Sequence, residues 1–234
     1  MKKVLFILVS LMCAFQALAQ ERKLQFRPYI DQRRFHWGFC FGLQMQDLEF
    51  KNNGYIDPAT GEQWYADIDL YSPGFNVGVT GEMRLNRFLS LRLNPTMYFG
   101  QKRVLFHEQV SGKDTTQVLK STYISLPFDV KFAAPRHNNF RPYFVAGVAP
   151  SIDLTTRKHK ALRTNPFDCF VEVGVGCDMY FSFFKLIPEL KFCFGLADVL
   201  NKKRDDLIDG ALIKYTNGLD AAHAKMIVLT LYFE

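Results

Sequence analysis

The stretch 169–181 alternates between two kinds of side chain. Every odd position is apolar, from Cys169 to Phe181, whereas the even positions include Glu172, Asp178 and two glycines. Because side chains on a β-strand point to opposite faces in turn, this stretch predicts a strand with one continuous apolar face. A soluble β-sandwich buries such a face, whereas a membrane barrel turns it toward lipid, so this stretch alone leaves both architectures open.

The same period of two recurs along the rest of the chain. It predicts further strands at 35–45, 74–84, 88–99, 122–132, 141–154, 184–196 and 225–234. The connections alternate between short turns and long polar loops, which are expected at 46–73, 100–121, 155–166 and 197–223. Strands of about ten residues joined in this way are typical of outer-membrane barrels. The sequence therefore predicts an all-β fold, an eight-stranded antiparallel transmembrane β-barrel with long extracellular loops and short periplasmic turns.

Three prolines fall in the middle of predicted strands. Pro95, Pro127 and Pro188 each lack the N–H group that a central strand donates to its neighbour. A closed barrel has no free edge where this loss would be harmless, so we expect local bulges at these positions.

The N-terminus resembles an export signal. Basic residues at Lys2 and Lys3 precede an apolar run that ends at the small-residue site 17–19. This pattern predicts a signal peptide cleaved after Ala19, whereas the residues before Cys13 fit a lipoprotein signal poorly. We therefore divide the chain into a signal peptide (1–19), a periplasmic lead-in (20–34) and the barrel (35–234), located in the cell outer membrane.

Composition narrows the function classes. Aromatic residues make up 15% of the chain, with 23 Phe, and they predict belts at the two membrane interfaces. Near the short turns these are Trp37, Phe88, Phe132, Phe181, Phe184 and Phe233; near the long loops they are Phe99, Phe167 and Phe194. Loss of Lys2 and Lys3 lowers the net charge from +6 to +4, and the basic residues are scattered, which argues against nucleic acid.

Four cysteines remain in the predicted barrel, namely Cys40, Cys169, Cys177 and Cys193. An even number in an exported protein allows disulfides. However, alternation places Cys169 and Cys177 on the apolar face and the other two on the opposite face. We therefore favour free thiols that act as small hydrophobes.

The polar face of the predicted strands carries many charges. An eight-stranded barrel is only wide enough inside for side chains to fill it, and buried charges need partners. The sequence predicts a structural charge network in the interior made by Glu82, Arg84, Arg92, Asp129, Lys131, Glu172, Asp178, Glu189 and Lys191. This network favours a plugged lumen over the alternative, a path for protons or a ligand along the same residues.

Catalytic signals are weak. His107, His159 and His223 fall in predicted loops, but no nucleophile-elbow or metal-ligand spacing accompanies them. We expect no enzyme activity, no catalytic or metal-binding residues, no cofactor and no small-molecule substrate. A hydrolase or acyltransferase at the loop rim remains the enzyme alternative.

Two motifs carry a family resemblance. The segment 123–132, followed after a short connection by 141–150, resembles the eight-stranded outer-membrane barrels that are abundant in Bacteroidota. The lead-in 29–33 before 35–38 is similar to the PorT family, the barrel component of the type IX secretion and gliding system. The resemblance spans the whole mature chain, and Pro127 is part of the family pattern.

This resemblance implies an accessory role in type IX protein secretion. The expected partners are outer-membrane lipid and other type IX components, and the protein would assist export without being the conduit. The alternative within the same fold is a structural or adhesin-like small barrel.

Overall fold

The computed structural model describes residues 26–56, 61–70, 72–109, 112–155, 164–201 and 218–234, so the predicted signal peptide lies outside the described residues. A single-turn 3₁₀ helix, η1 (Ile30–Gln32), precedes eleven strand segments. These are β1 (Phe35–Asn52), β2 (Trp64–Leu70), β3 (Ser72–Arg84), β4 (Leu89–Leu93), β5 (Thr96–Glu108), β6 (Asp114–Ser125), β7 (Phe128–Ala133), β8 (Phe140–Asp153), β9 (Phe167–Tyr180), β10 (Lys185–Gly195) and β11 (Leu219–Phe233). The described residues contain no helix that is long and apolar enough to cross a membrane.

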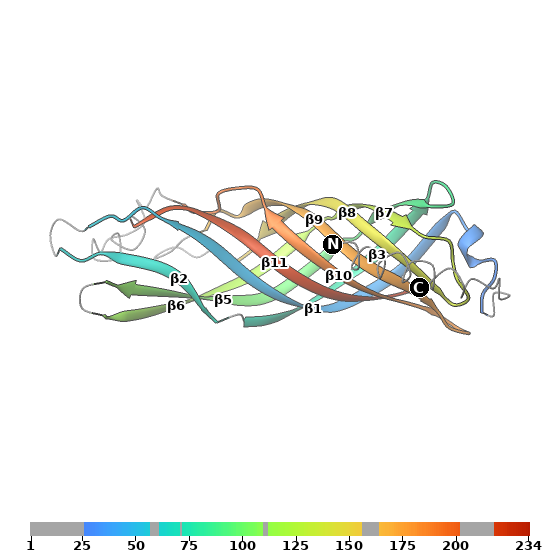
Figure 1. Cartoon of the computed structure of the whole chain (residues 1–234), viewed down its shortest axis with the longest axis horizontal. Helices are drawn as coiled ribbons and strands as arrows, with labels where there is room; N and C mark the ends of the chain where they lie inside the picture. The colour runs from blue at the N-terminus through green and yellow to red at the C-terminus, as the bar shows by residue number, and fades with distance from the viewer. Residues whose placement is uncertain (1–25, 57–60, 71, 110–111, 156–163, 202–217) are drawn as a thin grey trace, which may run out of the picture.

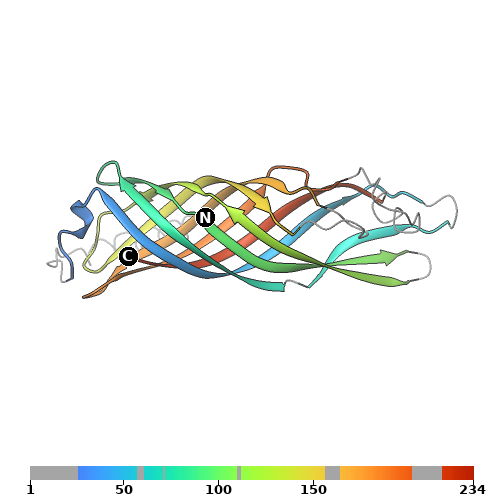
Figure 2. The same cartoon turned by 180° about the vertical axis from the view of Figure 1, so that it is seen from behind.

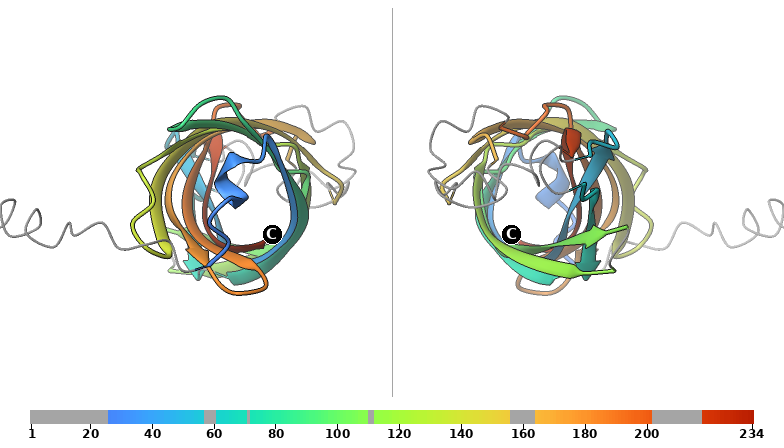
Figure 3. Two further views of the ribbon diagram at one scale, coloured as in Figure 1. Left: turned by 90° about the vertical axis from the view of Figure 1, so that its right-hand side faces the viewer. Right: turned by 90° about the vertical axis from the view of Figure 1, so that its left-hand side faces the viewer.

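The strands close into one antiparallel barrel. The sheet runs β2-β5-β6-β8-β7-β4-β3-β1-β11-β10-β9, and the additional pairing of β8 with β9 joins its ends. Figures 1 and 2 show the strands winding around one long axis, and Figure 3 shows the closed wall along that axis. Three pairs of segments (β2 with β3, β4 with β5, β6 with β7) continue one another, which gives eight positions around the barrel. The predicted antiparallel barrel is confirmed.

The prolines interrupt the ladder without shifting it. On both sides of Pro95, β3 keeps one register against β4 and β5, and β6 and β7 share one register against β8 on both sides of Pro127. Pro188 lies inside a continuous β10. The predicted bulges are therefore wrong, because each proline loses only its own donor. The carbonyls of Pro95 and Pro127 still accept hydrogen bonds from Val79 N and Asn94 N, each at 3.1 Å.

Several predicted loops are strands. β1 continues to Asn52, β2 occupies part of 46–73, and β11 begins at Leu219. The predicted loop 100–121 is mostly a β5–β6 hairpin, in which Gly112 adopts a φ of 66° and its N–H reaches the carbonyl of Glu108. These extensions project beyond the other strands at one end of the barrel (Figure 1). We call residues 47–52, 64–67, 102–108, 114–120 and 219–224 the projecting section, and the rest of the strands the membrane section.

The outer face of the membrane section is apolar. Exposed side chains include Trp37, which is 76% exposed, and Phe144, and they alternate with buried polar residues along each strand. Aromatic rings pair near the short turns, where Phe184 lies 5.0 Å from Phe181 and 6.4 Å from Phe233, centroid to centroid. This surface is suited to lipid, and its rings form the interfacial belt expected at that end.

The interior changes character along the barrel. In the projecting section the buried side chains are largely apolar and include Leu48, Trp64, Ala66, Val104, Phe106, Leu219 and Ala222. In the membrane section they are largely polar or charged. All four described cysteines are free, with Cys40 and Cys193 buried and Cys169 and Cys177 half-buried.

Candidate functional site in the charged interior

Strand alternation places a set of charges inside the membrane section. The inward residues of β3, β4, β7, β9 and β10 meet in the lumen, where their side chains are at most 6% exposed. Of the nine predicted interior charges, eight lie together there: Glu82, Arg92, Asp129, Lys131, Glu172, Asp178, Glu189 and Lys191. Two further residues, Lys185 and Glu234, join them. We call these ten residues the charge network.

Arg92 is the centre of the charge network. Its Nη1 lies 2.5 Å from Oε2 of Glu189, and its Nη2 lies 3.2 Å from Oε2 of Glu82. Glu82 is the direct neighbour of Arg92 on β3, whereas Glu189 on β10 is on the opposite side in the strand order. One guanidinium therefore ties together opposite walls of the barrel.

Two lysines, Lys191 and Lys131, connect further carboxylates to the charge network. Lys191 Nζ lies 2.5 Å from Asp129 Oδ2 and 2.9 Å from Glu172 Oε2, which joins β10 to β7 and β9. Lys131 Nζ lies 2.8 Å from Asp178 Oδ1 and 3.2 Å from Glu82 Oε2.

The last lysine extends the network to the C-terminus. Lys185 Nζ is 2.8 Å from Glu234 Oε2 and 3.5 Å from Asp178 Oδ2. With the contacts of Lys131 and Lys191, ion pairs run from Glu172 to the last residue of the chain.

Neutral donors complete the site, and the sequence prediction did not include them. Tyr143 donates its hydroxyl to Glu189 Oε2 at 2.5 Å, and Tyr232 donates to Oε1 at 3.0 Å. The Arg92 guanidinium lies over both rings, 5.4 Å and 4.9 Å from the centroids, a favourable cation–π arrangement. The strand alternation that identified the charges also places these tyrosines inward.

The charge network is not balanced in charge. Its ten members are six carboxylates and four cations. The two tyrosines donate to Glu189, and Asn94 Nδ2 donates to Asp129 Oδ2 at 2.9 Å. Such donors stabilise buried negative charge without adding a cation. Asp129 Oδ1 and Glu234 Oε1 are buried and have no hydrogen-bond partner among the described residues.

Arg84, the ninth predicted residue, lies elsewhere. It has the inward parity of Glu82, but it is the last residue of β3 and therefore reaches the rim. There its side chain donates to the backbone carbonyls of Asn86 and Asp31. Its assignment to the interior network is wrong, because alternation fixes the face of a residue and not its depth.

The lead-in forms a second cluster of contacts at this rim, which we call the mouth cluster. Asp31 of η1 accepts a hydrogen bond from Tyr180 at 2.5 Å and lies 3.4 Å from Arg136 and 3.7 Å from Arg141. The Arg136 guanidinium also lies 3.6 Å from the Tyr180 ring centroid. Figure 3 shows η1 at the mouth of the barrel. The side chain of Asp31 thus helps to hold the lead-in at the barrel end, together with backbone contacts: Arg136 donates to the carbonyl of Arg27 at 3.2 Å, and Phe26 N donates to Asn139 Oδ1 at 3.3 Å.

The predicted loop histidines do not meet. His107 pairs with Asp114 at 2.6 Å on the exposed face of the β5–β6 hairpin, whereas His223 lies on β11. His159 lies outside the described residues. Within the part of the chain that the structure describes, no three metal-ligating side chains come together.

Comparison with known proteins agrees with this architecture. Residues 18–201 match the family model described as outer membrane protein beta-barrel domain. The chain belongs to this family. It is accordingly an outer-membrane β-barrel protein, and the charge network lies within the family's barrel. No curated protein matches the chain.

Among solved structures, the chain is similar to the outer membrane protein OprG of Pseudomonas aeruginosa, with 11% identity, coverage of 85% of this chain and 92% of OprG, and a TM-score of 0.43. It is also similar to Ail, the attachment invasion locus protein of Yersinia pestis, with 14% identity, coverage of 86% and 99%, and a TM-score of 0.37.

Proposed function

We propose that this barrel is a non-conducting accessory component of type IX protein secretion in the outer membrane. The observation that carries the accessory role is the cross-lumen pairing of Arg92 with Glu189 and of Lys191 with Asp129. A polypeptide or a hydrated ion could pass only if these buried pairs separated, and an unpaired buried charge is strongly unfavourable. The barrel therefore acts through its surfaces and not through its lumen.

The link to type IX secretion rests on the sequence resemblance at 29–33, 123–132 and 141–150. The mouth cluster gives this proposal a physical element, because Asp31 within 29–33 helps to hold the lead-in against the barrel end. Residues 26–34, the described part of the lead-in, include exposed residues such as Tyr29 and Arg33, which would meet other secretion components in the periplasm. We expect these components to be its protein partners.

The test is a clean deletion in the native bacterium, followed by quantitative proteomics of the culture medium and cell surface. Loss of the proteins that carry type IX C-terminal signals, restored by the wild-type gene, supports the proposal. An unchanged set of secreted proteins contradicts it.

The same experiment addresses a second candidate, a structural or adhesin-like barrel. The observation that favours it is the projecting section, in which the β5–β6 hairpin and the ends of β1 and β2 extend beyond strands such as β8 and β9 (Figure 1). Unchanged secretion together with reduced attachment of the deletion strain would support this function instead.

A further inference from the structure

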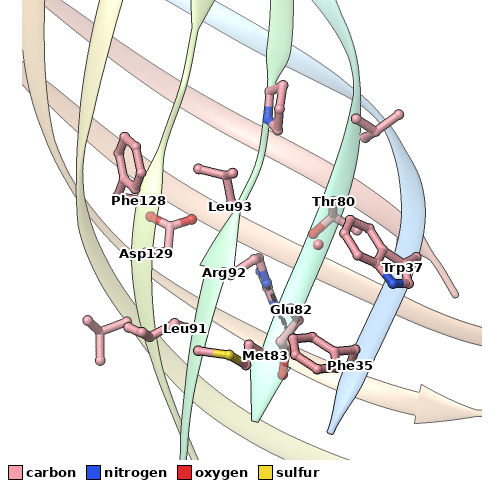
Figure 4. A pocket seen from close by; sticks show the side chains of 14 residues that line it. Phe35, Trp37, Thr80, Glu82, Met83, Leu91, Arg92, Leu93, Phe128 and Asp129 are labelled. Atoms are coloured by element: carbon pink, nitrogen blue, oxygen red, sulfur yellow. Dashed lines mark hydrogen bonds and ion pairs between the residues drawn. The ribbon is translucent and has the colours of Figure 1, made fainter. Parts of the chain in front are cut away.

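The outer wall of the membrane section contains an apolar groove next to the short-turn rim. Its volume is about 440 Å³. In Figure 4, Phe35 and Trp37 of β1 lie on one side and Leu91 and Leu93 of β4 on the other, with β3 between them. Further lining comes from Val79, Gly81, Met83, Pro95, Phe128 and Val130. The groove lies on the surface that faces lipid, whereas the charge network lies on the inward side of the same strands.

One outward position in the lining of the groove lacks a side chain. Trp37, Gly81, Leu93 and Phe128 form one row across four strands, and Gly81 is its only glycine. The Trp37 ring leans over this position, so that a Cβ added to Gly81 would lie 2.8 Å from Cζ3 of the ring. A larger residue at position 81 would therefore displace the indole and change the shape of the groove.

The chemistry of the lining selects an apolar occupant. The polar residues around the groove, Thr80, Glu82, Arg92 and Asp129, belong to the inward face and are buried. They therefore offer little to a ligand from outside. A concave apolar surface at membrane depth gains dispersion contacts with an occupant that fits it, and the hydrocarbon chains of lipid are the apolar groups that surround it.

Two exposed arginines indicate what kind of lipid it is. Arg34 immediately precedes Phe35, and Arg87 lies in the turn between β3 and β4 with its guanidinium 5.8 Å from the Phe88 ring centroid. Both residues are exposed, and their backbone lies at the short-turn rim, next to the groove residue Phe35 in the case of Arg34 and between β3 and β4 in the case of Arg87. Exposed arginines at a membrane interface attract anionic headgroups and can hydrogen-bond a phosphate.

We propose that the groove binds one acyl chain of an anionic phospholipid of the periplasmic leaflet, with its phosphate at Arg34 and Arg87. The chain lies in the groove beside the Trp37 ring, which itself covers Gly81. This lipid is retained at a defined site, unlike the lipids that pass along the rest of the wall.

Trp37 provides a direct readout. The sequence has two tryptophans, and Trp64→Phe leaves Trp37 as the only one. This variant is placed in vesicles that contain increasing fractions of brominated phosphatidylglycerol or, separately, brominated phosphatidylcholine, because bromine quenches an adjacent indole. We expect the brominated anionic lipid to reach half-maximal quenching at a fraction at least threefold lower than the fraction of brominated zwitterionic lipid that is needed. Equal quenching by both lipids, in proportion to their bulk fraction, would overturn the proposal.

Variants separate the groove from the headgroup contact. Gly81→Leu in the same background should remove the preference, and the matched control Val77→Leu, on the same outward face of β3, should keep it. Since Gly81→Leu could impair folding, a second variant with Arg34→Gln and Arg87→Gln leaves the groove intact and should make the two lipids equivalent. A preference for the anionic lipid that survives both Gly81→Leu and the double arginine variant would contradict the proposed site. Native mass spectrometry of the wild-type protein should show one retained anionic lipid. If a bound protein were found in place of the lipid, this result would also contradict the proposed lipid site.

Discussion

The membrane section and the projecting section use the same strands with opposite interiors. In the membrane section the outer wall is apolar and the lumen holds the charge network. In the projecting section the lumen holds Val104 and Phe106, while the outer wall carries ion pairs such as Lys51 with Asp220 at 3.4 Å. β5 passes from one arrangement to the other without a break.

This difference follows from the surrounding solvent. Lipid accepts apolar side chains, so the polar residues of the membrane section point inward and must satisfy one another there. Water accepts the charges of the projecting section, so the hydrophobic effect drives its apolar residues into the lumen. The two sections should therefore respond differently to the same kind of substitution.

The largest effect is expected in the charge network. Arg92→Met leaves Glu82 and Glu189 without their central cation, and breaking a buried pair in this way typically costs about 3–5 kcal/mol. Guanidinium unfolding of the vesicle-inserted barrel measures the change. Arg103→Met, on the exposed face of the projecting section, is the matched control and should change stability little. Similar losses for the two variants would contradict the distinction between the sections.

A cavity in the projecting section should act locally. Phe106 is 1% exposed, and truncation of such a residue to alanine typically costs about 3 kcal/mol. We expect Phe106→Ala to make the β5–β6 hairpin sensitive to trypsin while the membrane section keeps its heat-modifiable migration on gels. Loss of that migration would show that the two sections do not unfold separately.

A smaller effect is expected when one neutral donor is removed. Tyr143→Phe deprives Glu189 of a hydrogen bond to a charged acceptor, which is typically worth about 1.5–3 kcal/mol. The midpoint of guanidinium unfolding should fall by less than for Arg92→Met. Tyr65→Phe in the projecting section is the control, and an equal shift for both tyrosines would argue against a specific role for Tyr143.

The smallest effect is expected from an exposed pair. Lys225, 2.6 Å from Glu49, lowers the pKa of that carboxyl by its hydrogen bond and its charge. The pKa of Glu49 is therefore lower in the folded protein than in the unfolded chain. The pair stabilises the fold fully at pH values above the unfolded pKa of Glu49, and this contribution is lost as the pH falls through its folded pKa. Glu49→Gln should therefore be only slightly less stable than wild type at neutral pH and equally stable in strong acid, as unfolding curves at several pH values would show.

Alternation predicts the fold and the face of each residue well, because lipid imposes a strict period of two on the strands. It identified eight members of the charge network. It misplaced Arg84 because depth depends on where a strand ends, and it took 100–121 for a loop because the apolar residues there face the lumen and not lipid. Asp31 could not be found in this way, because its partners Arg136, Arg141 and Tyr180 are distant in sequence.

The closed lumen is tested most directly by conductance measurements on the purified wild-type protein in planar lipid bilayers. The pairing of Arg92 with Glu189 and of Lys191 with Asp129 across the lumen leads us to expect no steady channel current after insertion. A stable open channel in the wild-type protein would contradict the account of a barrel closed by its own charges.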